Sequence, residues 1–152
     1  MKIGIYYGSE TGNSEMVCYD IEAELKNDFD VEVKDLDDIA PADLSTDAFY
    51  IMVVSTHGDG DMPIPADHFV ERLKKQDADL KGINFAIFGM GDTLYDATYN
   101  WGSSKVAKAM TDRGAKQVGE RGLHDASGYD EPEDIAVPWA REIMTQVAGE
   151  VA

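Results

Sequence analysis

Two apolar runs in the middle of the chain constrain its fold more than any other feature. Residues 49–54 (FYIMVV) and 83–88 (INFAIF) show little alternation of apolar and polar side chains. A strand lacks that alternation when both of its faces are buried, as in the middle of a parallel sheet covered by helices on both sides. The two runs therefore predict central strands of an α/β domain.

The rest of the chain alternates strand-like and helix-like segments from end to end. We expect five strands, over residues 2–7, 30–34, 48–54, 83–88 and 116–123. Apolar residues recur at helical spacing in four other stretches: Val17, Ile21 and Leu25; Phe69, Val70 and Leu73; Val106, Ala109 and Met110; and Ala136, Trp139, Ala140, Ile143 and Val147. This order predicts a doubly wound sheet with right-handed crossovers, and 152 residues fit a single domain over 1–152.

Composition excludes several functional classes. The one cysteine, Cys18, rules out an intrachain disulfide, a cysteine-ligated zinc site and an all-cysteine iron–sulfur cluster. A formal charge of −17 argues against nucleic acid or an anionic membrane as a partner. The charge has two open explanations, simple solubility or an acidic docking face for basic partners. Neither a signal peptide nor a membrane span is visible, so we expect a soluble cytoplasmic protein.

Ligands of doubly wound sheets lie beyond the carboxyl ends of the strands, so the loops after the first, third and fourth strands form the candidate site. The first loop, 8–14 (GSETGNS), combines small polar side chains with the start of a helix. Hydroxyls and unpaired backbone N–H groups there would hold a phosphate without a cation. The alternative is a plain helix capped near Asn13 or Ser14. No lysine follows Gly12, so this is not a Walker-type loop.

The second and third loops suit a flat ligand. In 55–63 (STHGDGDMP), two glycines flank an aspartate and permit a sharp turn close to a ring, although a surface turn would look similar. In 89–96 (GMGDTLYD), Tyr95 would stack on a planar ring while Asp92 meets its polar edge. Together the three loops predict a ligand with a phosphate and a flat ring.

The motifs SETGNS, STHGDG and GMGDTLY resemble those of the flavodoxin family, in order and spacing, over essentially the whole chain. The sequence is also similar to the FMN domain of diflavin reductases. The resemblance implies an α/β, flavodoxin-like, doubly wound five-stranded parallel sheet of order 2-1-3-4-5 with helices on both faces. It also implies tightly but noncovalently bound FMN, and no long insertion in the fifth strand, as in short-chain flavodoxins.

The resemblance further implies the role of each loop. The phosphate would be held by Ser9, Glu10 (through its backbone amide), Thr11, Gly12, Asn13 and Ser14. The ring would lie between the second and third loops, against Ser55, Thr56, His57, Gly58, Asp59, Gly60, Met90, Gly91, Asp92 and Tyr95. Tyr95 would cover the outer face, Asp92 would meet the pyrimidine edge, and the Gly58–Asp59 peptide would turn its carbonyl toward flavin N5 on one-electron reduction. No metal ligand is expected.

Two positions depart from the family pattern. Ser14 replaces the usual threonine and keeps the hydroxyl. His57 stands where the family usually has an inner-face tryptophan or tyrosine, so either His57 itself or Met62 would cover that face. A ring-facing His57 would make the lower potential pH-dependent, whereas a solvent-facing one would not.

The implied function is electron transfer without a catalytic acid, base or nucleophile, because the flavin performs the redox chemistry. Acidic residues around the ring, namely Asp59, Asp61, Asp92 and Asp96, would lower the potential of the last reduction step. We expect a monomeric carrier that takes single electrons from a flavin-containing reductase and passes them to an acceptor oxidoreductase, both with basic docking faces.

The alternatives are an FMN-dependent NAD(P)H:quinone reductase and a flavodoxin-like binding module without cofactor. A response-regulator receiver is disfavoured because the third strand ends Val54-Ser55 rather than in a phosphoacceptor aspartate.

Overall fold

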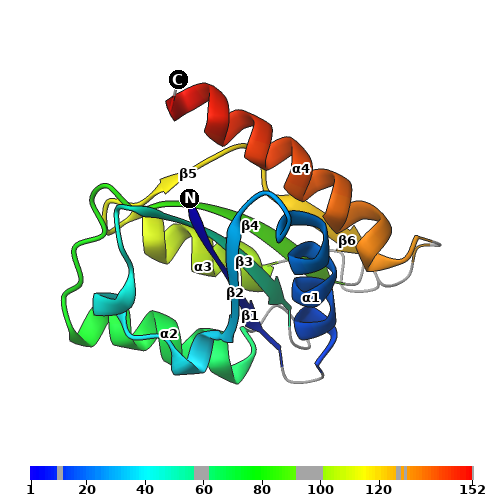
Figure 1. The fold of residues 1–152 in the computed structure, drawn as a ribbon. Helices are drawn as coiled ribbons and strands as arrows, with labels where there is room; N and C mark the ends of the chain where they lie inside the picture. Colours follow the sequence, from blue (N-terminus) through cyan, green and yellow to red (C-terminus); the bar gives the residue numbers. More distant parts are fainter. Residues whose placement is uncertain (10–11, 57–61, 92–100, 126–127, 129, 152) are drawn as a thin grey trace.

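One parallel sheet lies at the centre of the molecule, with β2, β1, β3, β4 and β5 side by side and β6 paired to β4 as well (Figure 1). The computed structural model describes residues 1–9, 12–56, 62–91, 101–125, 128 and 130–151. The first four strands are β1 (Lys2–Gly8), β2 (Asp30–Asp35), β3 (Ala48–Ser55) and β4 (Asn84–Gly91). The order is β2-β1-β3-β4-β5 with parallel pairing throughout, which confirms the doubly wound 2-1-3-4-5 topology.

The predicted fifth strand is divided into two. β5 (Lys116–Gln117) pairs with the start of β4, and β6 (Gly122–Asp125) pairs with its end. The prediction of one continuous strand over 116–123 was wrong because Gly119, between the two pieces, has φ +70°, which extended backbone does not adopt. Both pieces run parallel to β4, so the sixth strand continues the same edge of the sheet.

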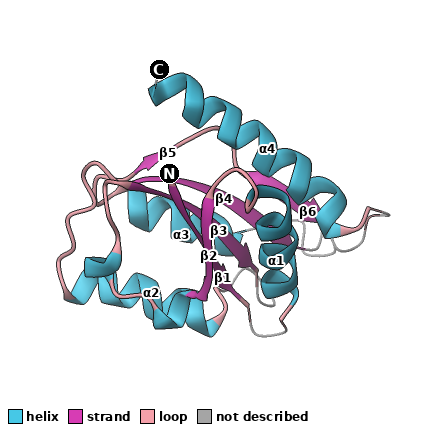
Figure 2. Cartoon of the chain, in the orientation of Figure 1, coloured by secondary structure: helices cyan, strands magenta, loops and turns pink. Residues whose placement is uncertain are grey.

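Helices cover both faces of the sheet (Figure 2). On one face α1 (Asn13–Leu25) and α4 (Pro132–Val151) pack over Phe49, Ile51 and Val53 of β3. On the other, α2 (Ile64–Lys75) and α3 (Trp101–Thr111) pack over the alternate residues of the same strand, Tyr50, Met52 and Val54. The prediction that this strand is buried on both faces is confirmed, and the helical stripes face the sheet as expected. No helix in the described part of the chain has the length and apolarity needed to cross a membrane.

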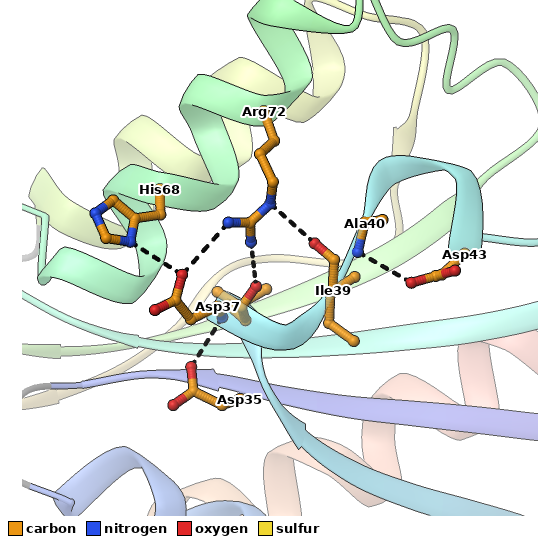
Figure 3. Close-up of polar contacts among 8 residues, drawn as sticks. Asp35, Asp37, Ile39, Ala40, Asp43, His68 and Arg72 are labelled. Carbon is orange, nitrogen blue, oxygen red and sulfur yellow. Dashed lines mark hydrogen bonds and ion pairs between the residues drawn. The ribbon is translucent and has the colours of Figure 1, made fainter.

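Arg72 of α2 fixes that helix against the connection between β2 and β3 (Figure 3). The connection contains two short 3-10 helices, η1 (Leu36–Asp38) and η2 (Pro41–Asp43). The guanidinium donates to the carbonyls of Leu36 at 2.7 Å and Ile39 at 3.2 Å, and it lies 3.3 Å from the carboxylate of Asp37. His68 Nδ1, one turn earlier in α2, lies 3.0 Å from the same carboxylate oxygen. His68 and Arg72 of α2 therefore converge on Asp37.

This arrangement reaches the first candidate loop. A Cβ at Gly8, the last residue of β1, would lie 3.1 Å from Ala66 Cβ in α2 and 3.2 Å from Leu36 Cδ1 in η1. The end of β1, the first turn of α2 and the start of η1 thus meet with no space for a side chain. Since α2 begins at Ile64, directly after the second loop, its placement also sets where that loop returns to the fold.

The Asp37 pair predicts a specific pH dependence of stability. The hydrogen bond from His68, and after it that from Arg72, lowers the pKa of Asp37 although partial burial opposes the change. A lowered pKa in the folded state contributes stability that is present above the unfolded-chain value of about 4 and is lost as pH falls through the folded value. We expect Asp37→Asn to cost at most about 1 kcal/mol near pH 7, since the pair is partly exposed to solvent, and the difference from wild type to shrink below about pH 4.

Urea unfolding across this pH range measures the effect. Asp38→Asn, a change in the exposed neighbouring aspartate of η1, is the matched control because it removes a carboxylate of the same short helix and leaves the contacts of Asp37 with His68 and Arg72 in place. Equal, pH-independent losses in the two variants would show that the Asp37 contacts do not stabilise the fold.

Candidate functional site

The three candidate loops leave the sheet side by side. In the sheet register Gly8 pairs with Val54, and Ser55 pairs with Met90, so β1, β3 and β4 end at the same level. Ser55 Oγ donates to the carbonyl of Gly8 at 3.3 Å, and the N–H of Thr56 donates to the carbonyl of Met90 at 2.8 Å. The prediction that the loops converge is confirmed for the residues at which they leave the strands.

The first loop ends in an open helix N-terminus. The N-cap of α1 is Gly12, with φ +83°, and its cap has no side-chain hydrogen bond. Asn13 and Ser14 lie directly after this N-cap, near the position that the alternative of a plain capped helix gave them. The first bond within the helix runs from the N–H of Met16 to the carbonyl of Gly12 at 3.1 Å, so the preceding N–H groups of the first turn have no partner within the helix. A Cβ at Gly12 would meet nothing within 4 Å, which leaves open space beside the turn. Such an end attracts anions through its N–H groups and its dipole.

Ser14 connects the first loop with the third. Its side chain is fully buried, and its hydroxyl lies 3.5 Å from the sulfur of Met90, which is 8% exposed. Sulfur is a weak acceptor, so the hydroxyl of Ser14 would lose little energy by giving up this contact for a stronger hydrogen bond. Asn13 is exposed and Ser9 is half-buried. The roles of these three residues toward a phosphate stay predictions.

The second loop begins against the first turn of α3. Thr56 Oγ1 accepts a hydrogen bond from the N–H of Gly102 at 3.0 Å. A Cβ at Gly102 would lie 2.7 Å from the carbonyl oxygen of Ser55 and 3.1 Å from Thr56 Cα, so only glycine lets α3 approach this closely. Sequence reasoning missed Gly102, because the apolar stripe of α3 identifies its buried face and not what its first turn touches.

The third loop begins between β3 and β6. Met90 and Gly91, the last residues of β4, pair with His124 and Asp125. His124 is buried, and its Nε2 lies 2.8 Å from the carbonyl oxygen of Asp130, which only accepts, so Nε2 carries a proton. The sequence offered no signal for this histidine, since its place beside Met90 depends on the division of the fifth strand.

Half of the predicted site residues lie outside the described part of the chain. They are Glu10, Thr11, His57, Gly58, Asp59, Gly60, Asp92 and Tyr95, and the carboxylates of Asp61 and Asp96 lie outside it too. Met62, proposed as a cover for the inner ring face, is half-buried and packs against the apolar cluster under α2 and α3. Which residue covers that face therefore stays a prediction.

The described residues show where the single cysteine lies and whether acidic, histidine and cysteine side chains gather as a metal site. Cys18 lies in α1 in the apolar core, and burial raises the pKa of its thiol well above the ordinary value. In residues 1–9, 12–56, 62–91, 101–125, 128 and 130–151, no three His, Cys, Asp or Glu side chains come together as a possible metal site.

The fold and the convergent loops agree with a family assignment. The family model described as flavodoxin matches residues 5–139. The chain belongs to the flavodoxin family. Members of this family bind FMN and transfer electrons, and FMN is accordingly the cofactor of this site.

The chain matches both much longer relatives and relatives of about its own length. The NADPH-dependent diflavin oxidoreductase 1 of Schizosaccharomyces pombe is 31% identical over 150 residues, which is 96% of this chain but only 26% of that protein. Protein MioC of Escherichia coli O157:H7 is 32% identical over 137 residues, 90% of this chain and 92% of MioC. The crystal structure of oxidised flavodoxin 2 from Bacillus cereus superimposes with a TM-score of 0.82 at 27% identity, over 95% of this chain and 99% of that one.

The described residues fit FMN. A phosphate monoester needs N–H and hydroxyl donors, and the open end of α1 supplies N–H groups beside Ser9, Asn13 and Ser14. A flat ring needs the backbone to come close to it at the strand ends. The tight contact of Gly102 with Ser55 and Thr56, and the hydrogen bond between Thr56 and Met90, hold the backbone in place where the second loop begins. Among the described residues, these donors, the N–H groups and the side chains of Ser9, Asn13 and Ser14, carry no charge.

The contact between Thr56 and Gly102 predicts the effect of an isosteric substitution. Thr56→Val keeps the shape but leaves the N–H of Gly102 without its acceptor, so we expect a loss of about 1 to 2 kcal/mol in the free energy of unfolding. Thr56→Ser keeps the hydroxyl and should lose clearly less. Urea unfolding of the two variants measures the difference. A serine variant as unstable as the valine variant would assign the effect to the methyl contact instead.

Proposed function

We propose that this flavodoxin is an FMN-binding carrier that shuttles single electrons from a flavin-containing reductase to an acceptor oxidoreductase. The observation that carries the proposal is the convergence of the ends of β1, β3 and β4 beside the open N-terminus of α1. One end of this site suits a phosphate and the other suits a flat ring. The flavin supplies one-electron chemistry when it is bound.

The residues of the chain bind and orient the cofactor. Backbone N–H groups of the first turn of α1, with hydroxyls of the first loop, would hold the phosphate of FMN. The fixed strand ends at Ser55, Thr56 and Met90 would set the positions from which the second and third loops reach the ring. Carboxylates of those loops, Asp59, Asp61, Asp92 and Asp96, would oppose added negative charge and lower the last potential. No acid, base or nucleophile is needed.

The proposed partners follow from charge and from the relatives. A formal charge of −17 favours redox partners with basic docking faces, whose association would weaken as salt rises. Two relatives, the diflavin oxidoreductase and the human NADPH–cytochrome P450 reductase, contain a similar segment within a much longer chain. They support a flavin-containing reductase as the donor. We further propose a monomer that works in the cytoplasm.

Stepwise anaerobic reduction of the FMN-loaded protein, followed by visible absorption, tests the proposal. We expect reduction in two separate one-electron steps, because a carrier of single electrons must hold the flavin at an intermediate oxidation level. Complete two-electron bleaching by NADH or NADPH alone would favour the quinone reductase. Failure of the protein to take up FMN would refute both functions.

A further inference from the structure

An acidic side chain in the first turn of α1 is held by two phenols. Glu15 is the third residue of α1, and its Oε2 accepts hydrogen bonds from Tyr7 Oη at 3.0 Å and from Tyr19 Oη at 3.1 Å. Tyr7 is the last residue but one of β1, and Tyr19 lies one turn further along α1. Tyr7 is half-buried, whereas Tyr19 is 46% exposed. Two side chains from different elements thus meet on one carboxylate oxygen.

A glutamate at this position can have a different partner. As the third residue of a helix it can reach back to the N–H of the N-cap residue, and the helix dipole favours a negative charge there. A carboxylate there would use the same N–H groups and the same positive potential that a phosphate needs. Within the described part of the chain, Glu15 is bonded to the two phenols and not to the N–H of Gly12.

The phenols are suited to this role because they stay protonated donors. Burial, followed by the hydrogen bond to Glu15, raises the pKa of Tyr7 above its ordinary value. The hydrogen bond to Glu15 likewise raises the pKa of Tyr19. Tyr7 has Asp35 of β2 and Val53 of β3 as its neighbours in the sheet. The Glu15 carboxylate lies within electrostatic range of Asp35, so the two phenol hydrogen bonds hold it near a second acidic residue.

We infer that Tyr7 and Tyr19 are positioning residues that hold the Glu15 carboxylate away from the N-terminus of α1 and so keep it free for the phosphate of the flavin. The inference rests on the proposed binding of FMN. It concerns the phosphate end only, so it distinguishes FMN from riboflavin, which has the same ring without the phosphate. Removal of either phenol releases the carboxylate to compete for the site, and removal of the charge ends the competition.

A mutant cycle read by flavin fluorescence tests the inference. Apoprotein of wild type, Tyr19→Phe, Tyr7→Phe/Tyr19→Phe, Glu15→Gln and the combined variants is titrated with FMN and, separately, with riboflavin. We expect the tyrosine variants to bind FMN roughly two- to fivefold more weakly, as a charge at a helix end is worth about 0.3 to 1 kcal/mol. Their affinity for riboflavin should stay unchanged. Glu15→Gln should bind FMN at least as tightly as wild type and should abolish the effect of both tyrosine changes.

Controls separate this effect from general charge and from folding. Glu22→Gln removes a carboxylate two turns further along the same helix, and it should leave the affinity for FMN unchanged. Tyr19→Phe alters an exposed side chain, so it tests the inference even if the Tyr7 variant is unstable.

Four results would count against the inference or its premise. Equal weakening of FMN and riboflavin, or a tyrosine effect that persists in Glu15→Gln, would assign the phenols a packing role and overturn the inference. Unchanged affinity for FMN in the tyrosine variants would overturn it as well. Lack of FMN binding by the wild-type protein would instead overturn the proposed function.

Discussion

The parallel pairing of β1, β3 and β4 is the constraint on which the rest of the structure depends. Each of these strands is buried on both faces, so its backbone groups must be paired within the sheet and its side chains must be covered by helices on both sides. That requirement fixes the register, and the register brings Gly8, Ser55 and Met90 to one edge. The cofactor site is therefore a consequence of how the core is closed.

Arginines hold the helices in a chain with a large excess of acidic residues. Arg72 ties α2 to the β2–β3 connection, and Arg141 of α4 binds the carboxylates of Glu24 and Asp28 together with the carbonyl of Glu24. Arg113, after α3, donates in the same manner to Asp77 and to the carbonyl of Ala78. Each guanidinium joins a carboxylate to a backbone carbonyl, which suits its several fixed donors. These cations act within the fold, while the formal charge stays strongly negative.

The acidic composition also affects the site itself. A protein that binds a phosphate and carries thirty acidic residues must keep carboxylates from its own anion site. Glu15 shows the difficulty most directly, since it lies in the first turn of the helix that is proposed to hold the phosphate. Its two phenol partners, one from β1 and one from α1, provide a local solution that leaves the net charge unchanged. Charge that suits docking at long range can thus coexist with an anion site at short range.

The sequence by itself determined the strands buried on both faces, the apolar stripes of the helices and the strand ends at which the three candidate loops begin, because these depend on periodicity and on residues adjacent in the chain. Only the tertiary structure decided the division of the fifth strand at Gly119, the contact of Gly102 with Thr56, the place of His124 beside Met90 and the partners of Glu15. Each of these joins elements that are distant in the sequence or depends on a backbone angle. The local sequence pattern does not predict these features, since they form only when the helices pack on the sheet.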